Sequence, residues 1–393
     1  MTSATTPVVD AVVVGGGVLG ASCAYSLASE GLRVVLVERL HLASGASSSC
    51  QSGIGYGVTM DDDELAYYLA ATRAYHDLAQ EADIDYREDG ALVLPEPGDE
   101  PALRLKVEAL KARGVPSAWL DEGDLRLAEP RISVEFAGAA LLTDTAQVSP
   151  MRVVIELASR AKRLGVSVRT NTTVLGIDLS GDRVAAVQTT GGRIATEWVV
   201  IAAGAWSRDV GSLANLKVPV WPLKGHVIVS EPLPRRLRYY ISEERYDKTV
   251  SAMRATSMSD DGPEPTEPRV ASVLQSLPSG SILIGSSREF AGFDRTVVRE
   301  RLAALARSAC NVVPDLRGAR ALRTYAGLRP WTPDGKPLIG PTSQVRGIAF
   351  ATGHGGEGNT GALLGGRLLA ELIVGRKPSV NASRFSPDRF SLL

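Results

Sequence analysis

Three glycines near the start of the chain have the spacing of a dinucleotide-binding turn. Gly15, Gly17 and Gly20 follow an apolar run, Val12 to Val14, and a second apolar run ends at Glu38, 23 residues after Gly15. Gly15 permits a tight turn, Gly17 leaves room for a pyrophosphate near the backbone, and Gly20 lets a helix pack closely on the strand. The amides at the helix start favour a diphosphate, and Glu38 can accept hydrogen bonds from ribose hydroxyls. The complete pattern predicts dinucleotide binding, whereas the alternative is a turn without a ligand.

Three other segments rich in small residues are candidates for contact with the same ligand. Residues 44–57 hold too many glycines and serines for a core element. They suit a backbone that passes close to a flat ligand, or else they form a flexible loop. The apolar run 198–201 ends in Ala202-Ala203-Gly204, so a second strand end can lie against the dinucleotide, and residues 352–361 form another glycine-rich loop before a helix. Because these segments are far apart in the chain, the nucleotide-binding domain is expected to be discontinuous.

Length and composition are those of an ordinary globular protein with two lobes or domains. The chain has 393 residues, 44% of them hydrophobic and 22% charged, and a formal charge of -1. The chain has no excess of basic residues that would indicate nucleic-acid binding. No apolar run approaches the ~18 residues of a membrane span. The N-terminal apolar run reads as a core strand rather than a signal peptide. The scattered Cys23, Cys50 and Cys310 cannot form an iron–sulfur or zinc framework, so no metal site is expected and the cytoplasm is the simplest location.

The segments between the motifs give fewer signals. Carboxylates from Asp61 to Glu64 favour a helix start there, and Ser149-Pro150 are typical residues before and at the start of a helix over 151–164. His226 lies within an apolar strand and is expected to be packed rather than catalytic. Residues 242–269 are rich in Asp, Glu, Pro, Ser and Met with little periodicity. They are expected to form a mobile loop that acts as a lid or a partner surface.

The ordered set of motifs resembles the D-amino-acid oxidase, sarcosine oxidase and glycine oxidase family of FAD enzymes. The resemblance covers nearly the whole chain, and it includes two late segments, 326–330 (AGLRP) and 353–355 (GHG), that a nicotinamide Rossmann enzyme would not need. Residues 46–53 and 286–290 are similar to the flavoprotein subunits of opine oxidase, hydrogen cyanide synthase and D-hydroxyproline dehydrogenase. Those subunits carry Cys-Asp-Gly-Asn where residues 50–53 are Cys-Gln-Ser-Gly. Because of this difference, the resemblance does not identify the subfamily or its substrate.

The resemblance implies an α/β protein with a discontinuous, Rossmann-like FAD-binding domain and an α+β substrate domain whose sheet is mainly antiparallel. The FAD-binding domain is expected to comprise residues 1–82, 140–218 and 322–393. The substrate domain is expected to comprise residues 83–139 and 219–321. The active site would then lie between the two domains.

The resemblance also implies which residues contact substrate and cofactor. Arg329 is expected to bind the substrate carboxylate, because a guanidinium offers a bidentate fork and stays charged. Tyr56, Tyr246 and Tyr325 are candidate hydroxyls for substrate contact, and His354 is expected either to border the flavin or to pack behind it. The following residues are expected to bind FAD: Gly15, Gly17, Val18, Leu19, Gly20, Glu38, Arg39, Ser44, Gly45, Ser47, Ser48, Cys50, Gln51, Val174, Ala203, Gly204, Gly327, Arg329, Gly355, Gly356, Glu357, Gly358, Asn359 and Thr360.

Two parts of the expected cofactor site have specific roles. Ser47 and Ser48 would lie near the flavin phosphates or ring. Backbone amides from Gly355 to Asn359 would point to the pyrimidine end, where they would stabilise negative charge on the reduced ring. Family members that attach flavin covalently use a cysteine in the segment matching 322–332, and a complex-forming branch holds FMN through a histidine near 147–151. Neither residue occurs here, so one non-covalent FAD is expected.

The implied reaction is oxidation of the C–N bond of a small amino or imino acid by hydride transfer to flavin N5. Candidate substrates are glycine, N-substituted glycines, D-proline or hydroxyproline, and opines. This chemistry depends on orientation and a reactive ring more than on a protein acid or base. Electrons are expected to pass to a partner flavoprotein or iron–sulfur subunit in a hetero-oligomer, in the cytoplasm or at a membrane through that partner. The alternatives are a free-standing oxidase that produces hydrogen peroxide and a catalytically silent FAD-binding scaffold subunit.

Overall fold

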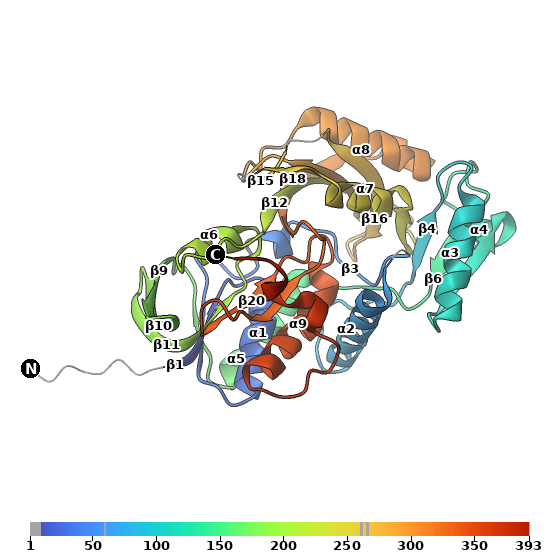
Figure 1. Cartoon of the computed structure of the whole chain (residues 1–393). Coiled ribbons are helices and arrows are strands. Elements are labelled where there is room, and N and C mark those ends of the chain that lie inside the picture. The colour runs from blue at the N-terminus through green and yellow to red at the C-terminus, as the bar shows by residue number, and fades with distance from the viewer. Residues whose placement is uncertain (1–8, 59, 260–261, 265–266, 393) are drawn as a thin grey trace, which may run out of the picture.

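The fold consists of two lobes, each built on an eight-stranded sheet. The computed structural model describes residues 9–58, 60–259, 262–264 and 267–392. Figure 1 shows one lobe around β1, β11 and β20 and the other beneath α8. The first sheet is mainly parallel and the second mainly antiparallel, which confirms the predicted fold class.

The first sheet contains the βαβ unit that the glycine pattern predicts. Its central order is β20-β11-β1-β2-β8, all parallel, with β19 antiparallel at the edge and β9 and β10 extending from β11 as an antiparallel meander. The strands are β1 (Val9–Val14), β2 (Val34–Val37), β8 (Ser167–Arg169), β9 (Val174–Ser180), β10 (Arg183–Thr189), β11 (Gly192–Ile201), β19 (Leu338–Pro341) and β20 (Ile348–Thr352).

Burial on both faces explains why β1 is a continuous apolar run. Ala11 and Val13 belong to the core beneath the helices, whereas Val12 and Val14 belong to a second core on the side of the meander. Parallel strands that are covered on both faces have no polar side. The helices α1 (Val18–Ser29), α5 (Pro150–Arg163) and α9 (Gly358–Ile373) pack together on the first face, and α2 (Asp62–Glu81) packs against α9.

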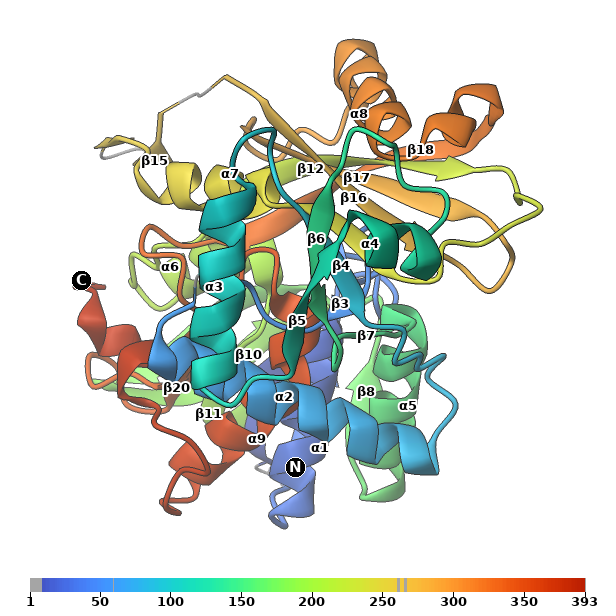
Figure 2. The ribbon, with the colours of Figure 1, turned by 90° about the vertical axis from the view of Figure 1, so that its right-hand side faces the viewer.

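The second sheet has the order β18-β12-β17-β16-β13-β4-β6-β5, and only the pair β13–β4 is parallel. Its strands are β4 (Ala91–Leu94), β5 (Ser117–Asp121), β6 (Gly138–Leu142), β12 (Trp221–Ser230), β13 (Tyr240–Glu243), β16 (Arg269–Ser276), β17 (Ile282–Phe290) and β18 (Ala321–Trp331). The helix α8 (Arg299–Val312) covers β16 and β17, and α7 (Arg245–Arg254) packs beside β16. Figure 2 shows α3 (Glu100–Ala112) and α4 (Glu122–Ala128) beside β4, β5 and β6.

The remaining elements are short. They are β3 (Gly53–Ile54) paired with β7 (Ala146–Gln147), β14 (Met258–Ser259) paired with β15 (Gly262–Pro263), and the helix α6 (Ser207–Ser212). Short 3₁₀ helices cover Ala46–Ser48, Gly204–Trp206, Pro314–Gly318, Ser383–Phe385 and Pro387–Arg389. Within the described ranges, no helix combines the length and hydropathy needed to cross a membrane.

The predicted loop over residues 242–269 is wrong in part. This segment contains the helix α7, the end of β13 and the β14–β15 pair, while residues 260–261 and 265–266 lie outside the described residues. Only Thr249 and Met253 of α7 are buried, so the helix has little apolar periodicity. Its polar face is instead fixed by ion pairs, including one from Arg245 Nε to Glu96 Oε1 at 2.8 Å. Partners so distant in sequence leave no local signal.

The expected domain partition stays a proposal, with one boundary changed. The first sheet takes its strands from the ranges expected for the FAD-binding domain, and the second sheet takes most of its strands from the other ranges. However, β18 (Ala321–Trp331) pairs with β12 along nearly its whole length in the second sheet. We therefore place the last boundary after Trp331 rather than at residue 322.

Candidate cofactor and substrate site

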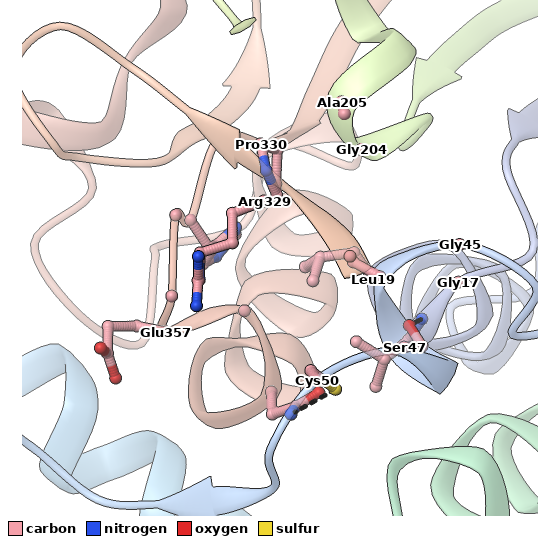
Figure 3. Close-up of a pocket in the computed structure, with 18 of the residues that line it drawn as sticks. Gly17, Leu19, Gly45, Ser47, Cys50, Gly204, Ala205, Arg329, Pro330 and Glu357 are labelled. Carbon is pink, nitrogen blue, oxygen red and sulfur yellow. Dashed lines mark hydrogen bonds between the residues drawn. The ribbon is translucent and has the colours of Figure 1, made fainter. Parts of the chain in front are cut away.

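One cavity runs from the glycine turn of the first lobe to β18 of the second. It is lined by segments from both lobes: the turn after β1, residues 44–58, β13, α7, β18 and the loop 354–359. Figure 3 shows Gly17 and Ser47 at one end of this cavity and Arg329 and Glu357 at the other. Every expected site residue lines the cavity except Gly20, Ser48, Thr360 and Tyr325.

The glycine end has the shape and the donors that a diphosphate needs. Gly15 has φ +115°, and a Cβ at this position would lie less than 3.0 Å from the backbone of Ala202, so no side chain fits. At the start of α1 the amide of Val18 donates to Ser47 Oγ at 3.1 Å, which places this hydroxyl at the helix N-terminus. An anion is favoured at such an end because the first amides of a helix lack intrahelical acceptors.

The Glu38 carboxylate is held beside the same turn. One oxygen accepts a hydrogen bond from the Gly16 amide at 2.7 Å, and the other accepts one from the Leu40 amide at 2.8 Å. The guanidinium of Arg39 lies over the Trp206 ring, 4.0 Å from its centroid, and both residues line the cavity. This arrangement fits a ribose and a base beyond the diphosphate.

Three of the expected cofactor residues have other positions. Gly20 lies behind the cavity, where a Cβ would clash with the Gly15 carbonyl, so its role is the close packing of helix on strand. Ser48 is exposed and does not line the cavity, whereas its neighbour Ser49 does. Thr360 Oγ1 accepts a hydrogen bond from the Gly55 amide at 3.2 Å and supports the first loop from behind.

Asn359 joins the first and last glycine-rich loops. Its side-chain Nδ2 donates to the Gln51 carbonyl at 2.9 Å and contacts Cys50 Sγ at 3.4 Å. Gln51 Nε2 in turn donates to the Val273 carbonyl of β16 at 2.7 Å. These bonds hold the middle of the cavity wall against both lobes.

The amides expected at the flavin pyrimidine are only partly available. The Gly355 amide donates to the Pro330 carbonyl at 2.8 Å, and the Glu357 amide donates to the His354 carbonyl at 2.9 Å. For these two amides the prediction is wrong, because the first is bonded to β18 and the second is bonded within the turn before α9. The amides of Gly358 and Asn359 begin α9 and have no acceptor within the helix.

Arg329 reaches across β12 to the middle of β17. Its Nη1 donates to the Ser287 carbonyl at 3.0 Å, and its Nη2 donates to Ser286 Oγ at 2.5 Å. Burial and the nearby cation of Arg288 lower the pKa of Arg329 to about 10. The guanidinium therefore remains charged at neutral pH and can bind a carboxylate in the cavity.

The expected hydroxyls differ in their availability. Tyr56 lines the cavity, but its hydroxyl donates to the Asp144 carboxylate, so it is not free for a substrate. Tyr325 does not line the cavity. Tyr246 does, with the Arg288 guanidinium 4.1 Å from its ring centroid.

His354 is buried and neutral. Its Nε2 lies 3.3 Å from the Tyr67 hydroxyl, and its Nδ1 has no hydrogen-bond partner among the described residues. Burial lowers the pKa of His354 to about 3. His354 also lines the cavity. A ring nitrogen without a hydrogen-bond partner is therefore consistent with a cavity wall that a bound cofactor would cover.

Several residues of the site were missed from the sequence. Tyr240 and Asp247 line the cavity, and Ser286 and Ser287 hold Arg329. Asp247 lies in the segment that was expected to be a loop. Only residues 286–290 carried a signal, through their similarity to known flavoprotein subunits, and that signal did not indicate a role.

The fold and the cavity together define a two-lobed protein with a dinucleotide-binding turn at one end of its cavity and the Arg329 cation at the other. Residues 10–372 match the family described as FAD dependent oxidoreductase, and the chain belongs to this family. It is a FAD-dependent oxidoreductase, and the expectations for family, enzyme class and FAD as cofactor are confirmed.

The relatives include both oxidases and a subunit of a larger enzyme. Glycine oxidase of Pseudomonas aeruginosa is 32% identical over 96% of this chain and 98% of the relative. Hydrogen cyanide synthase subunit HcnC of the same species is 28% identical over 97% of this chain and 96% of the relative. The crystal structure of glycine oxidase from Geobacillus kaustophilus aligns with a TM-score of 0.84 and 27% identity, covering 97% of this chain and 99% of that one.

Proposed function

We propose that this protein oxidises the C–N bond of a small amino or imino acid and passes the electrons to a partner subunit. The observation that carries the proposal is the charged Arg329 guanidinium in a cavity that continues to the dinucleotide turn. The names of the relatives, glycine oxidase and hydrogen cyanide synthase subunit, support a small amino-acid substrate. Glycine, N-substituted glycines, D-proline, hydroxyproline and opines all present the carboxylate that this site requires.

The FAD would be held by residues along the cavity wall. The start of α1 with Ser47 would receive the diphosphate, Glu38 the ribose, and the first amides of α9 the far end of the ring. Non-covalent binding is supported by the absence of cysteine from residues 322–332, and the absence of histidine from 147–151 argues against an additional FMN. When bound, FAD supplies the acceptor for the two electrons and the hydride that leave the substrate.

The chain's own residues would orient the substrate. Arg329 would pair with the carboxylate through its fork, and Ser286 and Ser287 would prevent the guanidinium from turning. Tyr246 and the buried ring of His354 would limit the space around Cα. A substrate anchored in this way can present one C–H bond in a fixed direction, which is the main requirement of the reaction.

The electron acceptor is proposed to be a flavoprotein or iron–sulfur subunit in a cytoplasmic hetero-oligomer, with any membrane association made through that partner. The similarity to HcnC supports this proposal. A free-standing oxidase that produces hydrogen peroxide is the second candidate, because the similarity to glycine oxidase is of equal extent. A scaffold subunit without turnover would have no use for a charged arginine in the cavity.

Anaerobic bleaching of the purified yellow protein tests the proposal. The protein is mixed with glycine, sarcosine, D- and L-proline, hydroxyprolines and opines, and air is then admitted. We expect at least one of these compounds to bleach the flavin, and the bleached state to persist in air but to clear with an artificial dye. Rapid recovery in air would identify an oxidase. No bleaching by any compound would contradict the proposed substrate class.

A further inference from the structure

The carboxylate of Glu357 is an unused acid at the substrate end of the cavity. Glu357 precedes α9 and lines the cavity. In the part of the chain that the structure describes, its carboxylate has no hydrogen bond and no ion pair. Two of the other cavity acids are engaged: the Glu38 carboxylate accepts two backbone amides, and Glu243 accepts the Ser272 amide and the Ser308 hydroxyl. An uncommitted carboxylate in this position is available to a ligand.

Charged groups of both signs surround Glu357. Asp247 and Arg254 come from α7, Arg288 from β17 and Arg329 from β18, and Arg254 is itself 3.7 Å from the Glu64 carboxylate. The phenols of Tyr68, Tyr240 and Tyr246 also lie close enough to interact electrostatically with it. Burial and the neighbouring Asp247 raise the pKa of Glu357 to about 7, against the opposing effect of the arginines. The group can therefore hold or release a proton near neutral pH.

The position of Glu357 relative to Arg329 suits an α-amino acid. Figure 3 shows Glu357 beyond Arg329 as seen from Ser47. In an α-amino acid the nitrogen is attached to the carbon next to the carboxyl group. A substrate whose carboxylate is paired with Arg329 therefore has its amino group close to Arg329, and Glu357 belongs to the same charged part of the cavity.

We propose that Glu357 binds the amino group of the substrate and accepts a proton from it. This inference rests on the proposed function. In the step, the ammonium N–H bond breaks and a carboxyl O–H bond forms, so a substrate ammonium and a carboxylate become a neutral amine and a carboxylic acid without any change in oxidation state. The neutral amine has a free lone pair, which an imine product requires, and the proton passes from Glu357 to solvent when the product leaves.

Binding of two unreactive analogues to the FAD-loaded protein tests this proposal. 2-Methylalanine has a carboxylate and an amine but no α-hydrogen, and isobutyrate has the same carbon skeleton without the amine. In Glu357→Gln we expect the affinity for 2-methylalanine to fall at least about tenfold, whereas the affinity for isobutyrate stays unchanged. Glu108→Gln, an exposed site on α3, is the matched control and should change neither affinity.

The pH dependence of wild-type binding gives a second measurement that needs no variant. Because the pKa of Glu357 is raised to about 7, 2-methylalanine should bind more weakly as the pH falls below this value, and isobutyrate should not. Equal effects of Glu357→Gln on both analogues, or parallel pH profiles, would overturn the role of Glu357. If the wild type binds neither analogue and is bleached by no amino acid, the proposed function itself fails.

Discussion

Gly225 leaves open the space in which the guanidinium of Arg329 lies. A Cβ on Gly225 would be less than 3.0 Å from the Nη1, Nη2 and Cζ atoms of Arg329. The two residues lie on the adjacent strands β12 and β18. The absence of a side chain at Gly225 therefore determines where the Arg329 guanidinium is held.

Gly225→Ala should consequently displace Arg329 without unfolding the protein, because the far end of a flexible side chain can move. We expect FAD to remain bound and the affinity for isobutyrate to fall about tenfold or more, as measured by titration of the flavin absorbance. Gly176→Ala on β9 is the matched control, since its Cβ would make only ordinary contacts with Gln188. Unchanged isobutyrate affinity in Gly225→Ala would show that Arg329 does not bind the carboxylate from its present position.

The two later glycines of the dinucleotide turn should respond differently to alanine. At Gly17 the added Cβ would meet only Ser47 Oγ, at 3.4 Å, and would project into the cavity wall. Gly17→Ala should therefore change the unfolding free energy of the apoprotein by no more than about 1 kcal/mol, while FAD affinity falls at least about tenfold. Flavin content after gel filtration and thermal unfolding of the apoprotein separate these effects.

Gly20→Ala provides the contrast. Its Cβ would clash with the backbone of Gly15, which cannot move away as a side chain can. We expect a lower melting temperature of the apoprotein itself, together with loss of FAD. If Gly17→Ala bound FAD normally, the diphosphate would not approach this turn.

The His354 ring should bind a proton more weakly in the folded apoprotein than in the unfolded chain, and this difference should make the apoprotein less stable in acid. The pKa of this ring is about 3 in the folded protein, against an ordinary value of 6.5. Between these values the unfolded chain binds the proton and the folded chain does not, so the unfolding free energy falls as the pH drops from 6.5 towards 3. The contribution is at most about 1.4 kcal/mol per pH unit.

Urea unfolding of the apoprotein at several pH values between about 7.5 and about 5 measures this difference. His354→Gln should show a shallower loss of stability than the wild type, because glutamine does not titrate. His76→Gln, at an exposed position of α2, should leave the slope unchanged. Parallel slopes for wild type and His354→Gln would contradict the burial of a neutral His354.

The local sequence pattern was sufficient to predict those parts of the site whose residues are close together in the chain. The turn from Gly15 to Gly20 and its partner Glu38 lie within one βαβ unit, so strand periodicity and glycine spacing predict them together. Arg329 was predicted because its segment resembles a family motif, not because its surroundings could be inferred. Its contacts with Ser286 and Ser287 arise because β12 pairs with β17 on one side and with β18 on the other.

Long-range contacts account for the parts that could not be predicted. The Tyr56 hydroxyl was a candidate for substrate contact, and its acceptor, Asp144, could not be foreseen because it is 88 residues away in the chain. The helix α7 was missed because its stabilising partners Glu96 and Asp99 belong to another segment. With α7 unknown, Asp247 could not be placed in the cavity, and the charged surroundings of Glu357 could not be recognised.

The most direct test of the account is anaerobic bleaching of the wild type and of Arg329→Leu with the same amino acid. The Arg323→Leu control changes an exposed arginine on the same strand. We predict that the wild type and the control lose their yellow colour with at least one amino acid of the panel. Arg329→Leu should keep its FAD but need at least about 30-fold more of that amino acid, because a carboxylate would lose its charged partner. Bleaching of Arg329→Leu at the wild-type concentration would contradict the account.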